Sequence, residues 1–389
     1  MPAKVVLPSV TLALMKAQAV TFALKVPTAG SIRRLTQLFL CVSLGALPSL
    51  ALAGAPISVG DGTAASCTEA PLTSALSLAE AQGGGTIQFD CGEDALAIIL
   101  TGTVTVPDNT TIDGDGRITL TVQSIPFTTV DVVVRVNSDT TAVIKNLSVR
   151  GGFTGVVNFG ALEVHHSAFS AAILHNVFNS GTLTVHNSTF SSEIEDVAGG
   201  GILNAGMLIV HDSTFSFNFG GGISNEGTAT IENSTFFQNQ FPEFEGGGIL
   251  NFGTLTVQHS TFSDNFGGAR GGGIYNQGIA TVRDCFFSGN DADFGGGIFN
   301  GGTLNVVDST IIQNNAPFSA GFGGGIFNGG PLTIANSIIT QNTARSAGGG
   351  IYTCVAGDVV GQNFGVACDG TLTLSDTSVT LNTPDNIFP

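Results

Sequence analysis

The amino-acid sequence predicts an all-β fold, a parallel β-helix in which short strands stack coil upon coil. Three observations carry this prediction: a phrase that recurs at steps of 21 to 28 residues, an alternation of apolar and polar residues inside each repeat, and two columns of asparagine at fixed places in it. A repeat of this length indicates a solenoid, because one unit cannot bury its own apolar face and must stack on its neighbours.

The phrase reads Gly-Gly-Gly-Ile-x-Asn-x-Gly, followed by an apolar-polar alternation and then Ser-Thr-Phe-x-x-Asn. Weaker copies with Val156 and Val177 in the isoleucine place lie upstream. The isoleucine of the phrase falls at Ile202, Ile223, Ile249, Ile274, Ile298, Ile326 and Ile351.

Within each repeat the apolar residues recur every second position, as in Leu183 and Val185 or Leu208 and Val210. This is the period of a strand with one buried face, and the repeats show no helical period. We therefore expect three short strands per coil, joined by turns and stacked at about 4.8 Å per coil.

Asparagine recurs at two places in the repeat. We expect each amide to bond to the same amide in the next coil and each asparagine to tolerate a left-handed turn. The glycine two residues after the first column is expected to adopt a positive φ. The first column is Asn158, Asn179, Asn204, Asn225, Asn251, Asn276, Asn300 and Asn328, and the second is Asn218, Asn239, Asn265, Asn290, Asn314, Asn342 and Asn382.

Residues 54–95 are predicted to cap the N-terminal end of the solenoid, which then occupies residues 96–389. Apolar residues at helical spacing indicate a helix that ends at the glycines 83–85, and residues 86–89 are expected to form the first strand. A lid of this kind would cover strand edges that otherwise promote polymerisation. The buried face of the helix is predicted to be Leu72, Ala75, Leu76 and Ala79.

Residues 1–53 are predicted to be a leader, with an export signal at 32–53 that begins at Arg33 and Arg34 and ends in a small-x-small cleavage pattern. All 29 acidic residues follow position 60, whereas five of the 12 basic residues lie in the leader, so the mature chain has a formal charge of −22. That charge opposes nucleic acid as a partner. We expect a secreted or cell-surface protein, with no membrane span in the mature chain.

Cysteines of exported proteins form disulfides, so we pair Cys67 with Cys91 and Cys354 with Cys368. The second pair would close an insertion at 354–368 that interrupts the last coils and is a candidate C-terminal lid. Cys285 stands in a column of serines and is expected to be a small buried substitute rather than a nucleophile.

The repeats resemble those of the polymorphic outer-membrane proteins, whose motifs are GGA[IVL] and FxxN. Phe215-x-x-Asn218 and Phe262-x-x-Asn265 match the second motif, and the likeness covers roughly residues 150–380. The segment 109–114 is similar to the opening of bacterial right-handed β-helix repeat proteins. The resemblance implies a right-handed β-helix at the cell surface or secreted, adhesive in its better-known members; this chain departs from it by having glycine for alanine in the first motif.

Aromatic residues occupy the outward place beside the first asparagine column in the later coils. An exposed stripe of this kind would bind sugar rings or another protein. The alternative is that loop phenylalanines at 244, 266, 294 and 322 fold over it. The candidate ligand-binding residues are Tyr275, Phe299, Phe327 and Tyr352.

Carboxylates in the loops before the triple glycines form an alternative acidic site, Glu243, Glu245, Asp291 and Asp293, preceded by a further acidic set in residues 193–196. Two such sets lie two coils apart, about 9.6 Å, which is near the upper limit for an inverting glycosidase. Arg270 belongs to the coil between them, so a surface ion-pair ladder of Glu245, Arg270 and Asp293 is the competing interpretation. The catalytic motifs of polysaccharide lyases and polygalacturonases are missing, and no catalytic residue is assigned.

No metal or cofactor is predicted. His165, His186 and His211 should stack outward on successive coils, but no further ligand is seen to complete a metal site, and the aspartates at 113 and 115 fit a plain turn. The sequence therefore favours an adhesion or binding module without catalysis, acting on a polysaccharide or a surface protein. The alternatives are a carbohydrate-active enzyme that uses the loop carboxylates and, more remotely, an ice-binding protein that uses the outward threonine rows, which are broken at Met207, Asn305 and Pro331.

Overall fold

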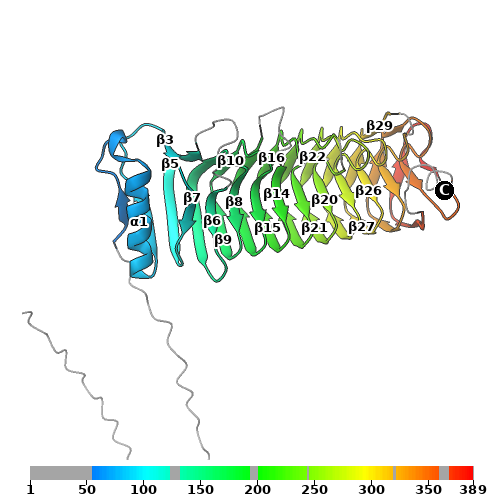
Figure 1. Cartoon of the computed structure of the whole chain (residues 1–389). Coiled ribbons are helices and arrows are strands. Elements are labelled where there is room, and N and C mark those ends of the chain that lie inside the picture. Colours follow the sequence, from blue (N-terminus) through cyan, green and yellow to red (C-terminus); the bar gives the residue numbers. More distant parts are fainter. Residues whose placement is uncertain are drawn as a thin grey trace, which may run out of the picture. The chain divides into compact units, whose positions relative to one another are not determined.

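The computed structural model describes residues 55–122, 132–192, 200–242, 245–318, 321–358 and 368–388. Over this part of the chain the strands stack into a parallel β-helix, and helix α1 (Glu69–Gln82) lies at its N-terminal end (Figure 1). Every strand pairing among the described residues is parallel, with the same place of the repeat facing itself in the next coil. The predicted fold class is confirmed.

Each regular coil contributes three strands, and each kind of strand forms one wall. The first wall comprises β4 (Val104–Val106), β6 (Val132–Val136), β8 (Thr154–Asn158), β11 (His175–Asn179), β14 (Gly200–Asn204), β17 (Ile223–Asn225), β20 (Ile249–Asn251), β23 (Ile274–Asn276), β26 (Ile298–Asn300), β30 (Ile326–Asn328), β34 (Ile351–Thr353) and β37 (Ile387–Phe388).

The second wall carries the five-residue strands. It comprises β9 (Ala161–His165), β12 (Thr182–His186), β15 (Met207–His211), β18 (Thr228–Glu232), β21 (Thr254–Gln258), β24 (Ile279–Arg283), β27 (Thr303–Val307), β31 (Pro331–Ala335) and β35 (Thr371–Ser375).

The third wall continues the same sheet around a corner. It comprises β10 (Ala168–Ser170), β13 (Thr189–Ser191), β16 (Thr214–Ser216), β19 (Thr235–Phe237), β22 (Thr261–Ser263), β25 (Phe286–Ser288), β28 (Thr310–Ile312), β32 (Ile338–Thr340) and β36 (Ser378–Thr380). In the early coils β5 (Thr110–Val122) and β7 (Thr141–Arg150) run through both walls, beside β1 (Ile57–Val59), β2 (Gly85–Phe89) and β3 (Leu96–Leu100). A short 3-10 helix, η1 (Ala64–Ser66), precedes α1, and β29 (Asn315–Ala316) pairs with β33 (Thr343–Ala344).

The inward residues form one continuous apolar column. Phenylalanines of the third wall stack from Phe169 to Phe287, with ring centroids 4.6–4.9 Å apart between neighbours and all of them buried. Stacking at the strand spacing keeps neighbouring rings in contact, and burying these side chains contributes hydrophobic stabilisation to the solenoid.

Both asparagine columns form buried amide ladders. In the first, each Nδ2 donates to Oδ1 of the next coil, as from Asn251 to Asn276 at 2.7 Å, and the second does the same, as from Asn265 to Asn290 at 2.8 Å. Where the second ladder lacks an asparagine, Asn176 on β11 donates to the Ser191 carbonyl and to Asn218 instead. The predicted amide bonds between coils are therefore confirmed.

The predicted backbone role of these columns is wrong. No ladder asparagine has a positive φ; the left-handed residues lie in the turn after the second wall, as at Asn187 and Asp212, and after the third, as at Asp264. The glycines after the first ladder also lack a positive φ. A Cβ on Gly253 would collide with the carbonyl oxygen of Gly227 in the preceding coil, so glycine is needed there because two backbones approach closely.

Helix α1 closes the N-terminal end as predicted. Leu72, Ala75, Leu76 and Ala79 are its buried residues, and Gly83 ends it in a left-handed conformation with φ 76°. The carboxylate of Glu69 accepts hydrogen bonds from the amides of Thr101 and Gly102 at 2.9 and 3.1 Å, which ties the helix to the chain that follows β3.

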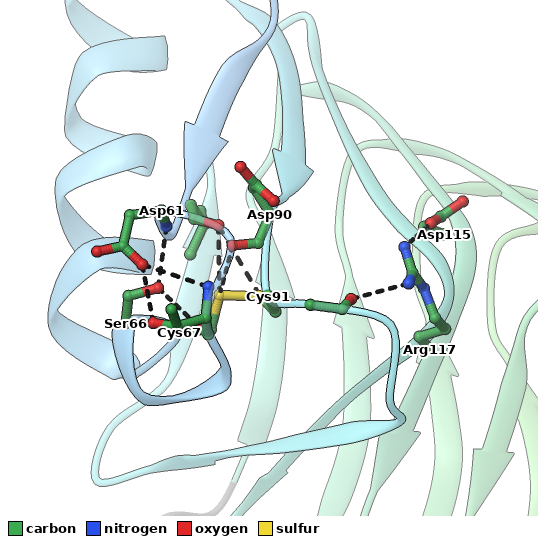
Figure 2. The surroundings of a disulfide bond; sticks show 10 residues. Asp61, Ser66, Cys67, Asp90, Cys91, Asp115 and Arg117 are labelled. Atoms are coloured by element: carbon green, nitrogen blue, oxygen red, sulfur yellow. Dashed lines mark hydrogen bonds and ion pairs between the residues drawn. A yellow bond between two sulfur atoms is a disulfide. The ribbon is translucent and has the colours of Figure 1, made fainter.

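The Cys67–Cys91 disulfide joins the segment before α1 to the end of β2 (Figure 2). Arg117 on β5 donates to the Gly92 carbonyl at 2.8 Å and pairs with Asp115, so the disulfide-linked loop is also held to the next coil. Strand β1, which the sequence did not predict, pairs with β2 in this cap.

Cys354 and Cys368 also form a disulfide, as predicted. Most of the insertion that it closes, residues 359–367, lies outside the described residues, as do residues 1–53, which the sequence predicts to be a leader with an export signal. Cys285 is a free, buried thiol: burial raises its pKa to about 11, and its Sγ lies 3.0 Å from the Arg283 carbonyl, where the column's serines place Oγ. Among the described residues there is no helix both apolar and long enough to cross a bilayer.

Candidate functional site

The aromatic residues predicted to bind a ligand are not exposed. Tyr275, Phe299, Phe327 and Tyr352 do point outward from the first wall and stack at 5.0–5.3 Å, but their exposed fractions are 5% or less. The prediction of an exposed stripe is therefore wrong, because a second apolar layer covers it.

That layer comes from the loops that lead into the triple glycines. Phe294 contacts Phe327 edge-on with centroids 5.4 Å apart, and Phe322 lies 4.8 Å from Tyr352. Phe294, Ala347 and Cys354 belong to the same buried cluster, and Phe322 and Cys368 pack against it. The phenylalanines at 294 and 322 thus fold over the aromatic stripe, as the alternative interpretation expected. Residue 244 lies outside the described residues.

Arg270 links this covered layer to the acidic loops. Its guanidinium lies 5.6 Å from the centre of the Phe299 ring and forms an ion pair with Glu245 at 3.2 Å. In the backbone, Glu245 pairs with Arg270, which in turn pairs with Phe294 rather than with Asp293. The first half of the expected ion-pair ladder is therefore present.

The remaining described carboxylates of the acidic site lie in one loop. Asp291 and Asp293 are partly buried, and burial raises the pKa of both side chains; neighbouring Asp264 adds to the shift at Asp291, while a hydrogen bond with Asn315 opposes it. One oxygen of Asp293, Oδ1, is buried without a hydrogen-bond partner. Glu243 and residues 193–196 lie outside the described residues.

The three histidines of the second wall stack outward as expected. The ring centroids of His165 and His186 are 4.9 Å apart, and those of His186 and His211 are 5.1 Å apart. Glu232, one coil further and missed by the sequence reasoning, places Oε2 3.3 Å from Nδ1 of His211. The nearly parallel rings direct their nitrogen lone pairs side by side rather than toward one point, and no group of metal-binding side chains is found in the described part of the chain.

The outer face of the second wall carries a regular array that we call the threonine strip. It occupies two outward columns on eight strands from β12 to β35, and none of its sixteen positions is charged. Seven coil steps give it a length of about 34 Å. Its members are Thr182, Thr184, Met207, Ile209, Thr228, Thr230, Thr254, Thr256, Ile279, Thr281, Thr303, Asn305, Pro331, Thr333, Thr371 and Thr373.

Comparison with known proteins agrees with this geometry. Residues 202–383 match the family model of the right handed beta helix region, so the coils have the right-handed sense that the resemblance implied. No curated protein sequence is significantly similar to the chain.

Several solved structures share the architecture at low identity. The A-module of the Azotobacter vinelandii mannuronan C-5 epimerase AlgE4 is 14% identical, with a TM-score of 0.48, and the match covers 85% of this chain and 97% of that one. The pectate lyase Pel9A is 13% identical (TM-score 0.42, coverage 80% and 72%). PfbA, a surface adhesin of Streptococcus pneumoniae, is 11% identical (TM-score 0.47, coverage 86% and 93%). Likenesses this distant carry no functional argument.

Proposed function

We propose that this protein is an exported binding module, secreted or displayed at the cell surface, that attaches to a polysaccharide or surface protein without transforming it. The observation that carries the proposal is the threonine strip. Its two columns contain no charged residue in a chain with 29 acidic residues, and interface cores are depleted of charge in the same way.

The strip is suited to attachment because its geometry is fixed by the fold. Every member is held by the parallel ladder of the second wall. The first of the two strip positions on each strand is exposed, including Met207 and Ile279, whose exposed fractions are 49% and 57%. β-branched side chains lose little rotamer freedom when a partner covers them. A rigid array of this length can contact an extended partner at many points.

The proposal is tested by incubating the protein with insoluble cellulose, chitin and bacterial cell walls, and measuring the bound fraction. Lysine at Thr230, Thr256 and Thr281 should reduce binding to the retained particle at least tenfold, since each places an unpaired charge in the contact. Lysine at Thr214, Thr235 and Thr261 on the neighbouring third wall is the matched control and should have little effect. If the protein binds none of the particles, or if both lysine variants lose binding equally, the threonine strip is not the binding surface.

A carbohydrate-active enzyme is the second candidate, and the raised pKa values of Asp291 and Asp293 favour it. A carboxyl group with a raised pKa can remain protonated and act as a general acid. This candidate predicts new reducing ends or unsaturated products from a soluble polysaccharide panel, lost on Asp293→Asn or Glu245→Gln. The binding proposal predicts no product with any of these substrates.

A further inference from the structure

A row of polar and aromatic side chains follows the corner where the third wall leads into the loops. These residues come directly after the second asparagine ladder, and each pairs with its counterpart in the next coil. We call the set the corner row: Gln240, Phe266, Asp291, Asn315 and Thr343. It lies on a different side of the coil from the threonine strip.

An exposed ring contacts one member of the row. Phe318, with an exposed fraction of 46%, meets Phe266 edge-to-face with centroids 5.9 Å apart. The contact fixes the orientation of Phe318 while much of its surface stays open to solvent. Such a ring offers an apolar face to the C–H groups of a sugar ring.

The polar members of the row are oriented by one another. Thr343 donates through Oγ1 to Oδ1 of Asn315 at 2.6 Å, and Asn315 also bonds to Asp291. Beside the row, Nε2 of Gln313 donates to Oε1 of Gln341 at 3.2 Å, and both amides are exposed. Amide and carboxylate groups have more donors and acceptors than these bonds use, so they can also bond to hydroxyl groups.

The charge of this corner selects against anionic ligands. Asp291 belongs to the row, Asp264 lies beside it, and no lysine occurs anywhere after Lys145. Arg345, two residues after Thr343, is the basic residue nearest to the row in sequence. A carboxylate on the ligand would be repelled, whereas a hydroxyl can donate to these acids.

We propose that the corner row binds a neutral polysaccharide running along the solenoid axis, with Phe318 stacked on one sugar ring and the amides of Asn315 and Gln313 bonded to hydroxyls. The inference rests on the proposed binding function but assigns a separate site, so either can fail without the other.

Affinity electrophoresis tests this site. The protein is run in native gels containing hydroxyethyl cellulose, laminarin, xyloglucan or, as the anionic arm, polygalacturonate. We expect retardation by at least one neutral polymer and none by polygalacturonate. Phe318→Ala and Asn315→Ala should each raise the dissociation constant about tenfold, the loss expected for one stacked ring or one well-placed hydrogen bond.

Phe252→Ala is the matched control, because Phe252 is similarly exposed at 52% and contacts Tyr275 edge-to-face at 6.1 Å on another corner. It should leave retardation unchanged, and thermal unfolding of all three variants should match the parent protein. Retardation by no neutral polymer, a preference for polygalacturonate, or equal loss with Phe252→Ala would overturn the site. The lysine variant of the threonine strip should still be retarded; if it alone abolishes retardation, the strip and not the corner row is the glycan site.

Discussion

At the residue scale, close packing between coils decides which side chains the repeat can accept. Gly253 follows the first asparagine ladder at a point where its Cα faces the Gly227 carbonyl, and the same contact recurs in the coils on either side. Cys285 is the opposite case: it replaces a serine without disturbing the column, because a thiol of similar size reaches the same carbonyl. Which side chains a repeat position can accept therefore depends on the space between neighbouring coils at that position.

Gly253→Ala tests this close contact. The added methyl group must push two coils apart, so we expect the free energy of unfolding to fall by about 3 kcal/mol, the cost of severe overpacking. Gly102→Ala is the control, since nothing lies within 4 Å of a Cβ at that position. Urea denaturation compares the two, and equal stability would contradict the backbone contact that the structure shows.

At the element scale, each ladder couples one coil to the next. The asparagine amides are buried and bonded to one another. Each amide therefore provides its neighbour with a hydrogen-bond partner and avoids the desolvation penalty of an unsatisfied buried polar group. Two histidines, His175 on β11 and His186 in the histidine stack, differ because their pKa values are shifted. Desolvation lowers the pKa of His175, and desolvation together with the charges of His165 and His211 lowers that of His186.

These shifts predict an acid dependence of stability. Below the ordinary histidine pKa of 6.5 the unfolded chain binds protons that folded His175 and His186 still exclude, so the free energy of unfolding falls as pH decreases through 6.5. His186→Gln should weaken this dependence between pH 7.5 and 5.5, whereas Gln258→Asn, which changes no titratable group in the same outward column, should not. An unchanged slope for His186→Gln in denaturation at the two pH values would refute the assignment.

At the scale of the whole molecule, stability is a sum over coils in contact with their neighbours, and the ends need separate protection. Helix α1 covers the N-terminal end and is fixed by Glu69 and by the Cys67–Cys91 disulfide. The second disulfide instead packs against the aromatic cluster on the outside of the first wall. The two disulfides thus stabilise different layers of the protein.

Replacing Cys67 and Cys91 by serine should lower the free energy of unfolding by about 3 kcal/mol, as expected for a loop of this length. Because coils contact only their neighbours, hydrogen exchange should accelerate in β1 to β3 and remain slow in β21. The Cys354/Cys368 double serine variant provides the comparison and should affect the later coils. A uniform change along the solenoid would contradict this local coupling.

The sequence by itself determined the coil, its inward column, both amide ladders, the capping helix and both disulfides. Each depends on a repeated local pattern, such as the alternation around Leu255 and Val257, that leaves few ways to bury the apolar side chains. Only the tertiary structure decided which outward residues are accessible. The aromatic residues around Phe299 and Phe327 alternate like exposed ones, yet loops from other coils cover them. Phe318 and the outermost positions of the threonine strip are exposed because no other part of the described chain packs over them. Exposure of an outward side chain depends on what packs above it, and the period of a strand does not contain that information.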